Sequence, residues 1–253
     1  MSALCQFFGS SLGKKYLMAV SGFILAGFVF GHMLGNLQMF LHPDHINLYA
    51  HQLQTLPYGL LWVVRLVLLG AVVVHIWSAI LLTMENRRAR PRGYQAEDTI
   101  QASYASRTMI WSGLIIAFFI VFHLLHYTTR SVFDYDWLYN YYLDGVGEPV
   151  LNVYAMMYVG FAKWYVSVFY LVAVFLLCQH LSHGISSMFQ SLGWRNKVWR
   201  PRLDRIALVF GWVVFLGFAA IPVAVMLDYF AGIPIFDTTS FEYAAAAISG
   251  GGN

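Results

Sequence analysis

Six of the nine histidines stand inside long apolar stretches of the chain, and four of them, His32, His75, His123 and His180, each lie in a different stretch. An ionisable side chain in such a stretch is rare, and it usually faces a protein interior where a partner or a cofactor meets it. Taken singly, each of the four is also explained as a structural histidine bonded to a backbone carbonyl. Their chemistry therefore depends on whether the chain brings them together.

The apolar stretches are the elements that must position these histidines. The chain has 253 residues, of which 59% are hydrophobic and 11% charged, and its mean hydropathy is +0.62. This composition lies outside the range of soluble domains, and a helix of roughly 20 apolar residues crosses a bilayer. We predict an all-α fold, a bundle of five transmembrane helices in a single membrane domain (1–253), with a disordered tail at 243–253. The expected spans are 16–41, 60–84, 108–128, 156–185 and 206–230.

The charged residues are sorted between the ends of these spans. Basic side chains gather at Lys14-Lys15, in residues 85–107 and in residues 194–205, whereas residues 130–154 hold four acidic side chains and one arginine. Loops rich in Lys and Arg stay in the cytoplasm. Every connection agrees on one topology, with the N-terminus in the cytoplasm and the C-terminus outside.

In this topology the four histidines fall into two layers of two. His32 and His123 lie toward the outer side and His75 and His180 toward the inner side, with roughly 15 Å between the layers at the rise of an α-helix. Two imidazoles at one depth on different helices suit haem iron, which takes one nitrogen from each face of the ring. Zinc would need three or four ligands. The pattern predicts two b haems and a path for electrons across the membrane.

Further polar residues lie near these positions. His126 and His183 each follow a predicted ligand by three residues, so they share its helix face. We expect them to bond a haem propionate or a group that contacts a ligand, and a ligand register shifted onto them is the alternative. Arg107, with Ser106, enters the third span and is expected either to pair with a propionate or to anchor the helix. Arg65 either meets an outer propionate or snorkels.

Gly27, Gly31 and Gly35 line one face of the first span at four-residue spacing. This stripe suits a bulky flat group lying beside the helix, or else a close contact with another helix.

His51 lies in the polar stretch after the first span, between Tyr49 and Gln52. These three residues are our candidates for contact with a quinone carbonyl. An exposed loop histidine is the alternative.

Several segments, in order and in their placement on the helices, carry a resemblance to a known family. The chain resembles the dihaem cytochrome b membrane subunit of succinate dehydrogenase and fumarate reductase, the type with one five-helix polypeptide. The matching segments lie within residues 10–193 and are SSLGKKYLMAVSG, HMLGNLQMF, NLYAH, ENRRARP, SYASRTMIWSG, FHLLH and HLSHG.

The resemblance implies the ligands, cofactors and partners. It makes His32 with His123 the ligands of the distal haem, and His75 with His180 those of the proximal haem. A flavoprotein carrying FAD and an iron–sulfur subunit would dock on the cytoplasmic face of a bacterial inner membrane, surrounded by lipid, and would hold the succinate chemistry. The electron carrier would be a quinone, commonly menaquinone. Nucleic acid has no part in this function, and a higher oligomer is left open.

One position departs from part of the family. Some members carry an acidic residue, linked to proton transfer, two positions before the fourth ligand, where this chain has Cys178. That departure puts such a proton path in doubt. Two alternative functions stay open: the dihaem anchor of a hydrogenase or formate dehydrogenase, and a haem-free transporter that relays protons through its histidines. The sequence does not decide between succinate oxidation and fumarate reduction.

Overall fold

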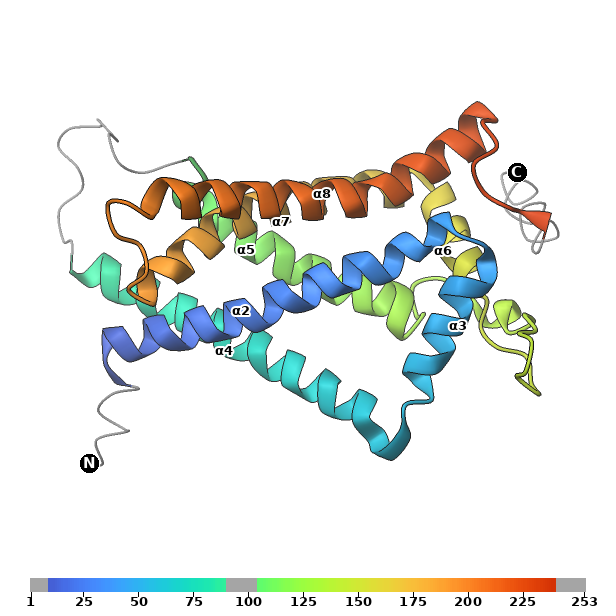
Figure 1. Cartoon of the computed structure of the whole chain (residues 1–253), viewed down its shortest axis with the longest axis horizontal. Coiled ribbons are helices and arrows are strands. Elements are labelled where there is room, and N and C mark those ends of the chain that lie inside the picture. Colours follow the sequence, from blue (N-terminus) through green and yellow to red (C-terminus); the bar gives the residue numbers. More distant parts are fainter. Residues whose placement is uncertain (1–8, 90–103, 240–253) are drawn as a thin grey trace. The chain divides into compact units, whose positions relative to one another are not determined.

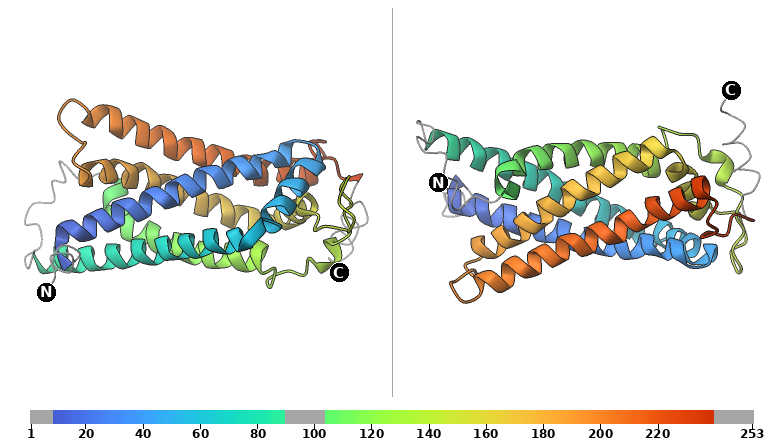
Figure 2. Two further views of the ribbon diagram at one scale, coloured as in Figure 1. Left: turned by 60° about the horizontal axis from the view of Figure 1, so that its bottom comes forward. Right: turned by 90° about the horizontal axis from the view of Figure 1, so that it is seen from above.

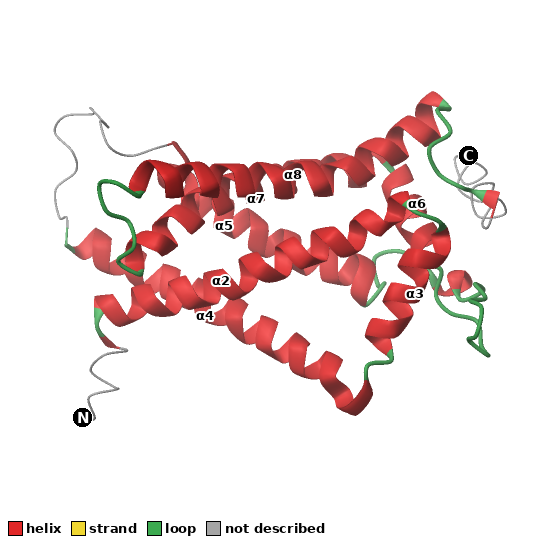
Figure 3. Ribbon diagram, in the orientation of Figure 1, coloured by secondary structure: helices red, strands yellow, loops and turns green. Residues whose placement is uncertain are grey.

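The structure is a computed structural model that describes residues 9–89 and 104–239, with side chains described from 109 onward in the second range. Within these residues the fold is helical (Figure 3), and the one strand-like pairing is an isolated bridge between Tyr141 and Val150. Five of the described helices are long and apolar enough to cross a membrane. The predicted all-α class and the five candidate spans are thereby confirmed. The expected disordered tail lies outside the described residues.

Figure 1 labels the helices along the chain. Short 3-10 segments and one π-helical turn join the longer helices. The bounds are α2 Ser11–Asn36, η1 Leu37–Phe40, α3 Pro43–Gln54, η2 Pro57–Gly59, α4 Leu60–Arg88, α5 Tyr104–His123, η3 Leu124–Thr128 (the π-helical turn), η4 Asp136–Leu138, α6 Val153–Ala162, α7 Trp164–Ser191 and α8 Arg200–Ala231.

The fourth span differs from the expected one at its start. The apolar run that begins near residue 156 is divided into two helices, because Lys163 takes an extended conformation with ψ 102° between α6 and α7. The fully buried Ser167 donates its hydroxyl to the carbonyl of Phe161 across this break. The spanning helix therefore begins at Trp164. An apolar run alone does not reveal such a break, since the sequence is strongly apolar on both sides of it.

The chain packs as two compact units. Unit 1 takes its described residues from 1–30, 59–112 and 178–212, and unit 2 takes them from 31–58, 113–177 and 213–253. Helices α2, α5, α7 and α8 each contribute residues to both units. His75 and His180 belong to unit 1, and His32 and His123 belong to unit 2. Each predicted pair of histidines thus lies within one unit.

In unit 1, α7 and α8 lie side by side and run in opposite directions from the loop that joins them (Figure 2). A Cβ built on Gly211 of α8 would meet the Ser182 hydroxyl and would lie 2.8 Å from the carbonyl oxygen of Cys178. The absence of a side chain at Gly211 therefore permits this close contact. Asp204 of α8 also forms an ion pair with Arg195 of the connecting loop, with 2.9 Å between nitrogen and oxygen, and accepts a hydrogen bond from Ser186 of α7.

In unit 2, the short helix α6 is the centre of the hydrophobic core. Its residues from Tyr154 to Ala162 are all buried. The buried amide of Asn152 caps this helix by accepting the Ala155 N–H, and it also accepts a hydrogen bond from Asn47 of α3. On its other side, a Cβ on Gly160 of α6 would lie 3.2 Å from Nε2 of His126, so α6 packs against η3, which follows α5.

Candidate functional site

The structure brings the four deep histidines together in two facing pairs. In unit 2 the ring centres of His32 (α2) and His123 (α5) are 5.8 Å apart and their planes are inclined by 79°. In unit 1 the ring centres of His75 (α4) and His180 (α7) are 6.2 Å apart and their planes are inclined by 63°. Four different helices thus supply the four imidazoles, and the partners are those expected from the sequence.

The spacing of the rings fits one metal ion between two imidazoles. A metal about 2 Å from each coordinating nitrogen places the two ring centres about 6 Å apart. The described residues contain no group of three or more His, Cys, Asp or Glu side chains placed to hold a metal. The donor set at each site is therefore two neutral nitrogens, which suits haem iron with its four remaining positions filled by the macrocycle.

Buried serines orient both rings of the His75/His180 pair. The Ser21 oxygen lies 3.3 Å from His75 Nδ1, and the Ser112 oxygen lies 3.3 Å from His180 Nδ1. Each serine donates its own proton to a carbonyl of its helix, Ser21 to Leu17 at 2.7 Å and Ser112 to the preceding turn. Each hydroxyl oxygen is left as an acceptor, so Nδ1 carries the imidazole proton and Nε2 keeps its lone pair.

The glycines of α2 differ in what lies beside them, and one of them makes room for the ring of His75. A Cβ on Gly22 would lie 3.2 Å from the His75 ring, so the ring packs directly on the α2 backbone. A Cβ on Gly27 or Gly31 would meet no atom of the described residues within 4 Å, whereas one on Gly35 would lie 2.9 Å from Tyr49. Of the predicted stripe, Gly27 and Gly31 make no helix contact of this kind. They leave space beside α2 for a flat group.

His123 belongs to a chain of buried hydrogen bonds. Its Nδ1 lies 3.3 Å from the hydroxyl of Tyr170, and that hydroxyl lies 2.9 Å from Nδ1 of His126. His126 Nε2 lies 2.8 Å from the hydroxyl of Tyr135. Burial raises the pKa of Tyr135 well above its ordinary value, so its hydroxyl stays protonated. Of the two roles expected for His126, the structure favours contact with a group that bonds a ligand, since tyrosines meet both of its nitrogens.

Comparison of the chain with protein families, curated proteins and solved structures finds no match. The geometry of the two histidine pairs and the sequence motifs are therefore the features that point to a function.

The other residues expected near a cofactor are more dispersed. His183 Nε2 lies 3.1 Å from the hydroxyl of Ser187, one turn further along α7. The exposed guanidinium of Arg65 lies 4.8 Å from the ring centre of Trp62. The side chains of Ser106 and Arg107 lie outside the described residues, although α5 includes both positions. Their expected contacts with propionates stay predictions.

The three quinone candidates lie in different surroundings on α3. His51 lines a cavity of about 280 Å³ between α3 and residues 139–151. Tyr49 packs its ring on Gly35, and Gln52 is exposed. Of the three candidates, His51 alone lines this cavity. The cavity is lined by Asn47, Ala50, His51, Gln54, Thr55, Tyr139, Glu148, Pro149, Val150 and Leu151.

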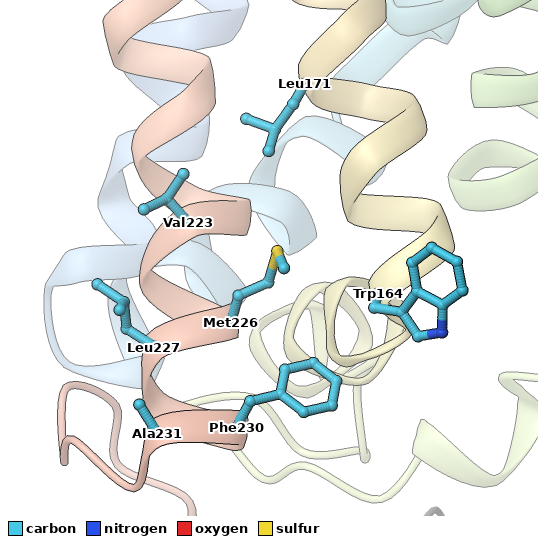
Figure 4. Close-up of a pocket in the computed structure, with 7 residues that line it drawn as sticks. All are labelled: Trp164, Leu171, Val223, Met226, Leu227, Phe230 and Ala231. Carbon is cyan, nitrogen blue, oxygen red and sulfur yellow. The ribbon is translucent and has the colours of Figure 1, made fainter.

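A second hollow, of about 600 Å³, lies between α7 and α8 in unit 2 (Figure 4). Met226 and Phe230 of α8 face Trp164 of α7 across it. The only polar side-chain atom among its lining residues is the indole nitrogen of Trp164. This hollow offers no group suited to acid–base or redox chemistry.

Ser21, Ser112, Tyr135 and Tyr170 were not expected from the sequence. A signal for the serines exists, because Ser21-Gly22 and Ser112-Gly113 repeat the same dipeptide in two spans. A small residue beside a hydroxyl is what a ring packed on a helix backbone requires. No comparable signal marks Tyr170, which reads as an ordinary aromatic residue of an apolar helix.

Proposed function

We propose that the chain is a five-helix membrane subunit that binds two b haems and passes electrons between a cytoplasmic iron–sulfur subunit and membrane quinone. The observation that carries the proposal is the presence of two facing imidazole pairs, with ring centres 5.8 and 6.2 Å apart, on four helices. The resemblance to the succinate dehydrogenase and fumarate reductase anchor supports the same four residues. Haem supplies an iron that takes up and releases one electron at each site.

The residues of the chain have separate tasks in this proposal. His32, His75, His123 and His180 present one nitrogen each to a haem. The Ser21, Ser112 and Tyr170 hydroxyls hold the other nitrogen of three of these rings and so orient them. The apolar surroundings keep water away from the iron and help to set its potential.

The proposed partners come from the resemblance, and the side on which they dock comes from the charge pattern. A flavoprotein with FAD and an iron–sulfur subunit dock on the basic, cytoplasmic side and carry out the dicarboxylate chemistry, so this chain has no dicarboxylate site of its own. Menaquinone or a related quinone exchanges electrons with the haems. His51 is the quinone contact that we retain, because it lines a cavity of about 280 Å³.

The haem count is the experiment that tests the proposal. The chain purified in detergent should contain two b haems per polypeptide by the pyridine haemochrome assay. His32→Ala and His75→Ala should each retain one haem, because the partners of each pair share a unit and the two pairs do not. A well-folded protein without haem would overturn the function, and two haems in His75→Ala would refute the pairing.

Co-purifying subunits distinguish this function from its nearest alternative. The dihaem anchor of a hydrogenase or formate dehydrogenase would present the same imidazole pairs. A co-purifying subunit with FAD that reduces the haems from succinate supports our proposal. A nickel or molybdenum subunit in its place would support the alternative.

A further inference from the structure

We propose that His126 is a positioning residue that fixes the tautomer of the haem ligand His123 through the hydroxyl of Tyr170. The inference rests on the proposed function, because it concerns how one ligand presents its nitrogen to iron. The three side chains and Tyr135 form a continuous series of contacts of 3.3, 2.9 and 2.8 Å. All of them lie in unit 2.

Counting protons along this series gives its direction. If Nε2 of His123 binds iron, its one proton lies on Nδ1 and is donated to the Tyr170 oxygen. The Tyr170 hydroxyl then donates its own proton to Nδ1 of His126. A neutral His126 that accepts at Nδ1 carries its proton on Nε2 and donates it to the oxygen of Tyr135. Every hydrogen bond therefore points away from the iron, and no group has to change its charge.

Without His126 the direction is no longer determined. The Tyr170 hydroxyl would lose its contact with His126, and its other hydrogen-bond partner in the structure is Nδ1 of His123. Donation to that nitrogen would leave the imidazole proton on Nε2, where it blocks coordination. His126 thus acts through Tyr170. By accepting the Tyr170 proton, it keeps the imidazole proton of His123 on Nδ1 and leaves Nε2 free to bind iron.

The surroundings of His126 hold it in place for this task. Its side chain has no exposed surface, and its ring stacks on Tyr127 with 3.8 Å between ring centres. A Cβ on Gly160 of α6 would lie 3.2 Å from His126 Nε2 and 3.1 Å from the Tyr135 hydroxyl. The α6 backbone at Gly160 therefore packs directly against the hydrogen bond between His126 and Tyr135. The π-helical turn at Leu124–Thr128 widens the helix at this residue, as is common at functional positions.

The contacts of His126 differ from those of His183, which has the same sequence spacing from His180. His183 meets Ser187, whereas Nδ1 of His180 meets Ser112. His126 and His183 each follow a proposed ligand by three residues. Only His126 contacts the same hydroxyl as its ligand, that of Tyr170. His183→Phe is accordingly the control for His126→Phe.

The experiment measures haem retention and redox potential in variants of the whole chain. His126→Phe should bind the His32/His123 haem roughly 10- to 100-fold more weakly, the usual effect of losing a partner of a metal ligand. Haem transfer to excess apomyoglobin measures this loss. The His75/His180 haem, which should stay bound, reports that the variant is folded.

Two further variants serve as rescue and control. His126→Asn should restore binding in part, because its amide oxygen accepts the Tyr170 proton. His183→Phe should leave the His32/His123 haem unchanged.

A second variant tests the same hydroxyl directly. Tyr170→Phe removes the acceptor of the His123 Nδ1 proton but introduces no competing donor. It should retain the haem better than His126→Phe and shift its midpoint potential upward, because an imidazole without that hydrogen bond donates less charge to iron. Wild-type retention and potential in both variants, with two haems in the parent chain, would overturn this inference alone. A parent chain without haem would overturn the proposed function instead.

Discussion

At the scale of single residues, three hydroxyl groups share one arrangement around the predicted ligands. Ser21, Ser112 and Tyr170 each meet Nδ1 of a ligand imidazole at 3.3 Å. The two serines donate their own proton to a backbone carbonyl, and Tyr170 has His126 as a second partner. A neutral hydroxyl accepts more weakly than a carboxylate. Hydroxyl partners therefore orient the imidazole but draw the Nδ1 proton away less than a carboxylate would, so the ring stays a neutral imidazole.

A serine variant tests this arrangement at the His75/His180 pair. Ser21→Ala removes one of two hydrogen-bond partners of the His75 ring, the other being the Met18 backbone, and losing such a partner lowers metal affinity roughly 10- to 100-fold. We expect faster loss of that haem to excess apomyoglobin, with the His32/His123 haem unaffected. Ser182→Ala is the matched control, because its hydroxyl bonds the Cys178 carbonyl of its own helix. Equal haem loss from the two variants would contradict the role given to Ser21.

At the scale of the elements, the approach of the helices depends on a few glycines. Gly211 packs α8 against the α7 backbone, and Gly22 packs α2 against the ring of His75. Gly184 and Gly70, in contrast, face no atom of the described residues within 4 Å. Glycine spacing in the sequence does not tell a glycine in close contact from one that faces open space. That difference depends on whether a neighbouring helix lies against the glycine.

Glycine-to-alanine substitutions in α7 and α8 should therefore change the free energy of unfolding in opposite directions. Gly211→Ala places a methyl group 2.8 Å from the carbonyl oxygen of Cys178. Because this oxygen belongs to the helix backbone, it cannot easily move away. Overpacking of this kind costs about 1–3 kcal/mol. Gly184→Ala meets no described atom and should be neutral or stabilising by up to about 1 kcal/mol, from helix propensity. Thermal unfolding in one detergent, followed by circular dichroism, compares them. A Gly211→Ala chain as stable as the Gly184→Ala chain would show that the contact has no such cost.

At the scale of the whole molecule, charge and hydropathy decide how the chain crosses the membrane. Five helices satisfy the length and composition of a span. Lys197 stands in the loop between α7 and α8, and Asn140 stands between α5 and α6. The positive-inside rule assigns the first loop to the cytoplasm and the second to the outside. Both residues are exposed, so both report on topology.

Cysteine labelling tests this topology. In a chain with Cys5→Ser and Cys178→Ala, we add either Asn140→Cys or Lys197→Cys and apply a membrane-impermeant maleimide. The cysteine at 140 should react in intact cells, and the one at 197 only after permeabilisation. Haem content of the background variant controls for folding. The reverse pattern would invert the topology and place the predicted partners on the other side.

The class of fold was predictable because it depends on quantities that are local in sequence. Runs of apolar residues long enough to cross a bilayer predict the five spans, and the histidine that lies deepest in each of the first four runs identifies a candidate ligand. Pairing followed from depth, since residues late in two outward or two inward spans lie at one level. The start of α7 was not predictable in this way. Its break at Lys163 depends on an extended backbone within an unbroken apolar run.

The sequence by itself determined the membrane class, the five candidate spans and which histidines face each other. These follow from hydropathy and from the constant rise of a helix, and neither requires knowledge of the neighbouring side chains. Only the tertiary structure decided that Ser21 and Ser112 meet His75 and His180, and that His126 reaches His123 through Tyr170. Hydrogen bonds depend on distances of a few tenths of an ångström between helices that are remote in sequence, and sequence spacing does not set such distances.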